Sequence, residues 1–259
     1  MQNIIVASDL SDRSNQAVRR GVELAIGLSA KLTVHHVVDS AMPSDIARDV
    51  QIQAKQKLQD TLALYLQGRD LTPIVSVEIG DVTEKISDAA KEARADLLIV
   101  GVHRRRVFLD QYRETTMERL IRSSRVPVLM VTSPGDQDYT HLLGAVGLSR
   151  ACAAAIQKGR KIAPQAKISL FHAHEVSFRK ESERDYATWK TVSVLPSALP
   201  DPMFIEASPD DAIHDLMVDG DYDIMAVGAH TRSSMGQFLL GGFTASLIRI
   251  PPCDLLIAK

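Results

Sequence analysis

The chain repeats part of its own sequence, and this repeat limits its fold more than any other feature. Residues 96–103 read DLLIVGVH and residues 223–230 read DIMAVGAH, at an offset of 127 residues (223 minus 96). The same offset, held without a gap, also aligns Arg105 with Arg232 and Leu120-Ile121-Arg122 with Leu247-Ile248-Arg249. The period is close to half the chain, which indicates a duplicated domain rather than a solenoid of short units.

A length of 259 residues allows one large domain or two small ones. Residues 133–140, SPGDQDYT, contain the Pro, Gly and Asp that mark a break between domains. We therefore expect one domain over residues 1–134 and a second over residues 139–259.

The first half alternates short apolar runs with longer segments of helical periodicity. The expected strands are residues 4–8, 32–38, 74–79, 97–100 and 128–132. The expected helices are residues 14–28, 44–66, 83–93 and 116–123. Strands separated by helices imply parallel βαβ units, and strands such as LLIV, which are apolar on both faces, imply a sheet covered on both sides.

The second half repeats this order with one departure. Its counterpart of the long helix, residues 176–200, contains two late prolines and shows no clean helical period, so we expect a short or irregular connection there. Trp189 lies in this segment, and a single Trp is more often a packing anchor than a platform for a ligand.

Composition excludes several classes of protein. Thirty Lys and Arg stand against 32 Asp and Glu, so no overall positive charge is available to hold nucleic acid or an anionic membrane. No apolar run approaches the roughly 18 residues of a membrane helix. The N-terminus lacks the basic start of a secretory signal, and two cysteines are too few for a disulfide framework or a Cys-rich zinc site. We expect a cytoplasmic protein.

Ligands of an open parallel sheet bind beyond the carboxyl ends of the strands. The segments that reach this edge are Ser8–Ser11, His36–Asp39 and the run from Gly101 in the first half, and 146–149, 172–175 and the run from Gly228 in the second. The last of these ends in Gly241-Gly242 at the head of a helix, where backbone N–H groups can bind phosphate. Neither a Walker A motif nor a G-x-G-x-x-G after the first strand is present.

Strand–Asp–x–Ser in the first half, His-Val after the second strand, and G-x-H-x-R before a helix in both halves resemble the universal stress protein family in its tandem form. The resemblance covers nearly the whole chain. It implies two open five-stranded parallel domains of Rossmann-like α/β fold, with strand order 3-2-1-4-5, arranged as a pseudo-twofold pair. ATP-binding members carry an Asp at the end of strand one and a loop G-x2-G-x9-G-[ST] around the phosphates and ribose.

Neither half matches this pattern fully. The first half has the Asp but carries Arg104 and Glu114 at loop-glycine positions, whereas the second keeps more of the loop but has Thr231 in it and Gly147 in place of the Asp. The resemblance implies these nucleotide-binding candidates: Asp9, Val37, Gly101, Arg105, Thr115, Ala173, Gly228, Arg232, Gly241, Gly242 and Thr244.

Several of these residues have simpler interpretations. Asp9 could equally cap the helix that starts near Ser11. The run Arg104–Arg106 could bind phosphate, but a solvated loop is the commoner role. His172 and His174 share a strand face whereas His35 and His36 do not, and we predict no metal other than Mg²⁺ brought by a nucleotide. Cys253 is expected to be a small core residue.

The sequence contains no G-x-S-x-G, no carboxylate dyad and no HExxH, so we predict no catalytic residue. The leading hypothesis is a stress-response binding or signalling module that takes ATP or another adenine nucleotide, more favourably in the second half. One alternative is slow ATP hydrolysis or adenylyl transfer, and the other is an interaction scaffold with two vestigial sites. The protein partners are unknown, and a homodimer is compatible with the internal pseudo-dimer.

Overall fold

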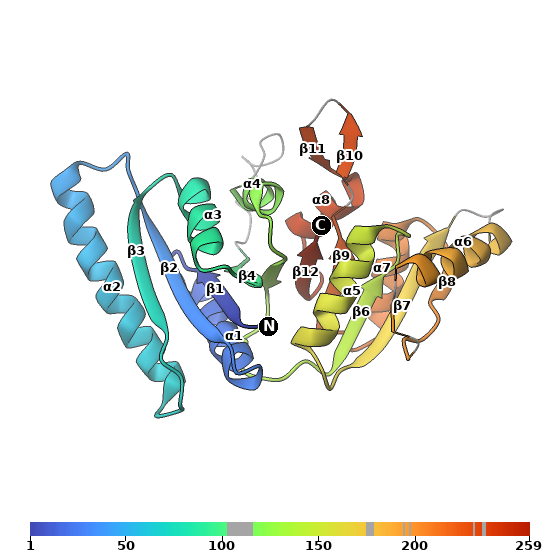
Figure 1. Ribbon diagram of the computed structural model, residues 1–259, viewed down its shortest axis with the longest axis horizontal. Helices are drawn as coiled ribbons and strands as arrows, with labels where there is room; N and C mark the ends of the chain where they lie inside the picture. The colour runs from blue at the N-terminus through green and yellow to red at the C-terminus, as the bar shows by residue number, and fades with distance from the viewer. Residues whose placement is uncertain (103–115, 175–178, 194, 197, 230, 235–236) are drawn as a thin grey trace. The chain divides into compact units, whose positions relative to one another are not determined.

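The computed structural model describes residues 1–102, 116–174, 179–193, 195–196, 198–229, 231–234 and 237–259, with the backbone alone at 231–234 and 237–240. The chain divides into two compact units, Met1–Gln137 (unit 1) and Asp138–Lys259 (unit 2). Each unit is an α/β structure that contains five mutually parallel strands (Figure 1).

Unit 1 alternates strands and helices along its whole length. Its elements are β1 (Asn3–Ala7), α1 (Asp12–Gly27), β2 (Lys31–Asp39), α2 (Ser44–Leu66), β3 (Ile74–Gly80), α3 (Val82–Glu92), β4 (Leu97–Gly101), α4 (Thr116–Ser123) and β5 (Val128–Val131). All neighbouring strands in it pair in parallel, in the order β3-β2-β1-β4-β5. The predicted strand order is therefore confirmed for this unit.

Unit 2 repeats the arrangement and adds a hairpin. Its elements are β6 (His141–Ala145), α5 (Arg150–Ile162), β7 (Lys167–His174), α6 (Arg179–Val192), β8 (Met203–Glu206), α7 (Pro209–Asp219), β9 (Ile224–Gly228), β10 (Thr231–Ser234), β11 (Gln237–Leu240), α8 (Gly242–Arg249) and β12 (Asp254–Ala258). The parallel order is β8-β7-β6-β9-β12, the same as in unit 1. Antiparallel β10 and β11 form a separate small sheet.

The central strands are buried on both faces. In β4, the consecutive residues Leu97, Leu98 and Ile99 are each fully buried. Because alternate side chains point to opposite faces, such a strand needs helices on both sides of the sheet. In unit 1, α1 packs beside α2, and α3 packs beside α4.

An aspartate holds the start of the first strand in each unit. Asp96 accepts hydrogen bonds from the backbone N–H groups of Gln2 (2.6 Å) and Asn3 (3.2 Å). Asp223, at the equivalent repeat position, accepts from the backbone of Thr140 (2.6 Å) and His141 (3.0 Å). The aspartate at this repeat position is thus explained in both units by its hydrogen bonds to the start of the first strand.

The predicted linker is attached to both units. Arg20 of α1 donates to the carbonyl of Gln137 and to the Ser133 hydroxyl (3.2 Å). Within unit 2, the Tyr139 hydroxyl donates to buried Asp254 (2.6 Å). The boundary between the units therefore lies between residues that hydrogen-bond to unit 1 and a residue that hydrogen-bonds to unit 2.

The prediction of an irregular connection at 176–200 was wrong for much of that segment. Residues 179–192 form α6, which buries Ser182, Tyr186 and Trp189. These three lie at i, i+4 and i+7, so they share one helix face. The period escaped detection because Ser182 is polar and most of the intervening residues are charged or polar.

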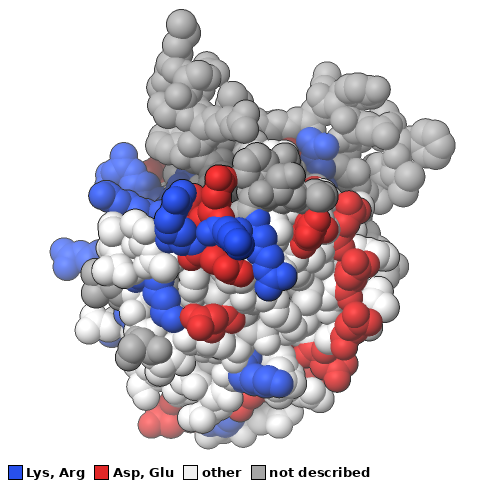
Figure 2. All heavy atoms as spheres, turned by 90° about the vertical axis from the view of Figure 1, so that its right-hand side faces the viewer, with Lys and Arg blue, Asp and Glu red and all other residues white. Residues whose placement is uncertain are grey.

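The exposed side of α6 carries charges of both signs, and it faces the viewer in Figure 2. Arg179 pairs with Glu183 (3.1 Å), and Lys190 pairs with Asp201 (2.9 Å). Figure 2 shows basic and acidic groups together over the upper centre of this face, and a further row of acidic groups along its right-hand edge.

Among the described residues, no helix is both long and apolar enough to cross a membrane.

Candidate functional site

The loop between β1 and α1 brings Asp9 to the carboxyl edge of the unit 1 sheet. The Asp9 carboxylate accepts hydrogen bonds from the Ser11 N–H (3.0 Å) and hydroxyl (2.5 Å). Ser11, not Asp9, is the N-cap of α1, since its hydroxyl accepts from the Ser14 N–H (3.4 Å). Asp9 is exposed, so its carboxylate is accessible to a ligand while it shapes the loop.

Further polar contacts hold this loop in place. Leu10 has a φ of 63°, in the left-handed region that side chains other than glycine seldom occupy. Its N–H donates to the Ser8 hydroxyl (3.1 Å), and its carbonyl accepts from Lys57 of α2 (2.9 Å). The Ser8 and Ser14 hydroxyls lie 3.0 Å apart. The acidic position is therefore supported by side chains from both α1 and α2.

A histidine ties the second strand to the first in both units. His36 Nδ1 lies 2.7 Å from the Ser8 carbonyl oxygen, and His172 Nδ1 lies 2.7 Å from that of Val146. A carbonyl can only accept, so the imidazole Nδ1 carries the proton in each case. These bonds bring the next residues, buried Val37 and half-buried Ala173, to the same edge as the first-strand loop.

Gly101 and Gly228 end β4 and β9 against the first turn of a helix. A Cβ on Gly101 would lie 2.6 Å from the Arg13 carbonyl oxygen, and one on Gly228 would lie 2.4 Å from the Cys152 backbone nitrogen. Backbone atoms cannot move aside cheaply, so both positions require glycine. The repeated glycine thus has a packing reason in each unit, separate from any contact with phosphate.

The equivalent loop of unit 2, between β6 and α5, is packed under an aromatic cluster. Trp189 donates its indole N–H to the Ser149 carbonyl (2.9 Å). The Cys152 thiol accepts from the Gly147 N–H (3.3 Å) and the Ser149 hydroxyl (3.3 Å). Leu148 has a φ of 53°, matching Leu10 of unit 1. Gly147 has no side chain, so this loop offers no carboxylate at the position equivalent to Asp9.

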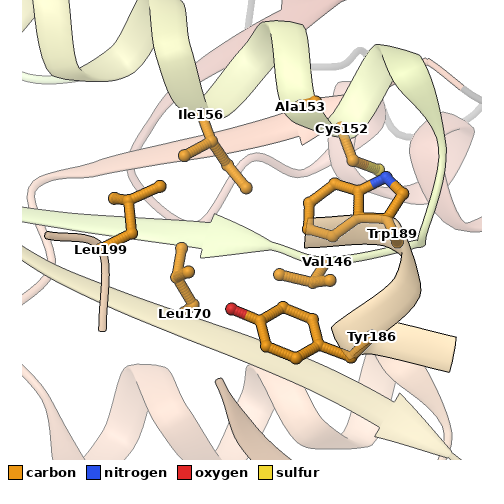
Figure 3. Packing of buried hydrophobic residues seen from close by; sticks show 8 residues of the cluster. All are labelled: Val146, Cys152, Ala153, Ile156, Leu170, Tyr186, Trp189 and Leu199. Carbon is orange, nitrogen blue, oxygen red and sulfur yellow. The ribbon is translucent and has the colours of Figure 1, made fainter. Parts of the chain in front are cut away.

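Figure 3 shows the buried residues that support the unit 2 loop. The indole of Trp189 lies beside Cys152, and the phenol of Tyr186 points toward Leu170. Burial raises the pKa of Tyr186, and nearby Lys190 opposes this. Trp189 is only 8% exposed, so it acts as the packing anchor that its sequence context favoured.

The start of α8 is exposed at Gly242. Gly241 is the N-cap and makes no side-chain capping bond. Gly242 is exposed, and a Cβ there would meet nothing within 4 Å. Thr244 is 1% exposed, and its hydroxyl has no hydrogen-bond partner in the part of the chain that the structure describes. A crossover helix runs opposite to its parallel strands, so α8 begins at their carboxyl edge.

Some predicted candidates cannot be placed in this geometry. Arg105 and Thr115 lie outside the described residues, as do Arg104 and Glu114. Arg232 is in β10, where only the backbone is described. The remaining candidates lie at strand ends or at the α8 start: Asp9, Val37, Gly101, Ala173, Gly228, Gly241, Gly242 and Thr244.

Sequence reasoning missed three features of these edges. The β10–β11 hairpin occupies part of the run treated as a glycine loop. Lys57 contacts the Asp9 loop from a distant helix, and no local pattern signals this. The paired roles of His36 and His172 were detectable, because both lie near the end of the second strand of their unit. No group of three metal-ligating side chains occurs among the described residues.

A family model for the universal stress protein family matches residues 1–132 and 203–259. The chain belongs to this family. The unmatched part of unit 2 includes α6, whose aromatic cluster sets it apart from α2 of unit 1. A search of curated proteins returned no match.

Solved structures match this universal stress protein along its whole length. A universal stress protein from Archaeoglobus fulgidus is 16% identical with a TM-score of 0.79, covering 99% of this chain and 98% of that one. A protein of unknown function from Pseudomonas aeruginosa is 18% identical with a TM-score of 0.68, covering 100% and 92%. At these identities the matches establish the tandem fold alone.

Proposed function

We propose that the protein is a non-enzymatic stress-response module that binds ATP or another adenine nucleotide in unit 2. The observation that carries this proposal is the start of α8. A helix N-terminus without a side-chain cap leaves its first N–H groups available to an anion, and the helix dipole favours negative charge there.

Two features of the site support a phosphate ligand. Gly242 leaves open space at the first helical position, so a phosphate can approach the backbone closely. The buried Thr244 hydroxyl has no partner among the described residues, and leaving such a group unsatisfied costs free energy. A bound phosphate oxygen or water could supply the missing partner.

The adenine and ribose would lie against the ends of β6 and β7. In this proposal Ala173 and the backbone around Gly147 contact the base, while Gly228 ends β9 beside them. Unit 2 has Gly147 where unit 1 has Asp9, so no carboxylate there can bind the ribose. The affinity for the nucleotide therefore depends on contacts with its phosphate groups. Unit 1 differs in this respect, because Asp9 places a carboxylate at the equivalent position of its sheet edge.

A charge substitution with an uncharged control tests the proposal. Gly242→Glu places an acid where the dipole favours it, so the helix should keep its stability while phosphate is repelled. Gly242→Gln has the same size and no charge. We expect isothermal titration calorimetry with ATP to show weaker binding for both variants, because each side chain fills the open space at Gly242. Binding to Gly242→Glu should be at least about tenfold weaker again than binding to Gly242→Gln, from Coulomb repulsion at close range. Equal ATP affinity in both variants, or no binding to wild type, would refute the proposal.

A turnover assay separates this function from slow hydrolysis or adenylyl transfer. We expect no phosphate or AMP release above background, with or without Mg²⁺. Hydrolysis that disappears in Asp9→Asn would instead establish an enzyme, with the acidic group of unit 1 near the reacting phosphate.

A further inference from the structure

His35, on β2 of unit 1, is fully buried, and neither ring nitrogen has a hydrogen-bond partner among the described residues. A buried imidazole normally finds a partner for at least one nitrogen. Its neighbour His36 does so through the Ser8 carbonyl. The isolated ring of His35 therefore requires a separate explanation.

Unit 2 carries an apolar residue at the equivalent place. The His35 carbonyl accepts from the Ser8 N–H at 2.9 Å, and the Phe171 carbonyl accepts from the Val146 N–H at 2.9 Å. Phe171 is 2% exposed. The fold thus accommodates a large apolar side chain at this site, and unit 1 instead carries one that can take up a proton.

The surroundings of His35 are defined by strand register. His35 pairs with Ala7 of β1 and with Ser76 of β3, and Val37 on the same face pairs with Glu78. Glu78 forms an ion pair with Lys85 of α3 (3.0 Å), so α3 covers this face. The charged or titratable groups that act on His35 are Glu78, His36 and Lys85.

Burial is the main reason why a charged imidazole is disfavoured in the closed structure. Burial lowers the pKa of His35, Glu78 opposes this effect, and His36 and Lys85 add to it. Glu78 also forms an ion pair with Lys85 (3.0 Å), so the carboxylate that favours a charged His35 is shared with that ammonium group.

We propose that His35 is an acid-sensitive latch, which takes up a proton only when α3 and the β2–β3 edge of unit 1 open. The sign follows from linkage. Below an ordinary histidine pKa of about 6.5, the open state binds a proton that the closed state excludes, so acid favours opening. Above that pH neither state is protonated, and the latch stays closed.

Hydrogen exchange across β2 and α3 measures this opening. After correction for intrinsic rates, wild-type protection should fall about tenfold between pH 7.5 and pH 5.5, the ratio set by a titrating open state. His35→Phe, which introduces the unit 2 residue, should remove that loss. His214→Gln, at an exposed position on α7, should leave the loss unchanged.

A second measurement does not depend on any variant folding. Nitrogen-15 imidazole spectra of the wild-type protein at pH 5.5 should show His35 still neutral. A His35 ring that titrates near 6.5 in the folded protein would overturn the proposal, as would His35→Phe with the same acid dependence as wild type.

Discussion

The two loops that follow the first strand of each unit share a backbone shape but differ in what supports them. Leu10 and Leu148 both adopt left-handed conformations, and Ser11 and Ser149 both cap the next helix. In unit 1 the support is polar and exposed, through Asp9 and Lys57. In unit 2 it is a buried thiol and an indole.

The two halves of the duplication have kept some contacts and lost others. Hydrogen bonds that fix the backbone, such as those of His36 and His172, are present twice. The groups exposed at the carboxyl edge of the strands differ between the units. Unit 1 has the carboxylate of Asp9, and unit 2 has the uncapped start of α8. Substitutions in each unit measure how far the two edges differ.

The largest expected effect is removal of the indole that covers the unit 2 loop. Trp189→Ala should lower the free energy of unfolding by about 3–5 kcal/mol, since it deletes a buried aromatic side chain and its bond to Ser149. Lys57→Met, which removes the counterpart contact to Leu10 in unit 1, should cost less than about 1 kcal/mol because Lys57 is exposed. Urea unfolding followed by circular dichroism measures both, and similar losses would mean that the loops are supported alike.

A smaller loss is expected from adding one methyl group at the repeated glycine. Gly228→Ala should cost about 1–3 kcal/mol, because its Cβ would overlap the backbone of Cys152. Gly242→Ala is the matched control, with open space around the new Cβ. Trp189 fluorescence during urea unfolding reports on unit 2, and a Gly228→Ala protein as stable as Gly242→Ala would remove the packing explanation.

The repeated aspartates should have comparable effects in the two units. Asp96→Asn and Asp223→Asn each weaken charge-assisted bonds to backbone N–H groups, at a cost of about 1–2 kcal/mol. Differential scanning calorimetry of the two variants measures this. A loss confined to one variant would show that the anchoring role is not shared.

Much of the fold was predictable because apolar residues recur with clear helical spacing or in short unbroken runs. The predicted bounds of 44–66 and 116–123 coincide with α2 and α4, and the apolar strands fell within a residue or two of the observed ends. Parallel βαβ order followed from the alternation of these elements.

The features that the sequence did not predict depend on contacts between residues that are distant in the chain. Helix α6 buries Tyr186 and Trp189 against residues of α5 and β7, and the polarity of its sequence did not indicate this packing. The glycines of the G-x-H-x-R motif were interpreted as ligand positions, but their close approach to α1 and α5 is visible only in three dimensions. Lys57 could not be associated with Asp9 for the same reason.

The most direct test of the proposed site is the amide spectrum of the protein during titration with ATP. If ATP binds at the start of α8, large chemical-shift changes are expected for the N–H groups of Gly242, Phe243 and Thr244, with smaller ones near Ala173. Shifts confined to residues 8–11 of unit 1, or none at millimolar ATP, would contradict it.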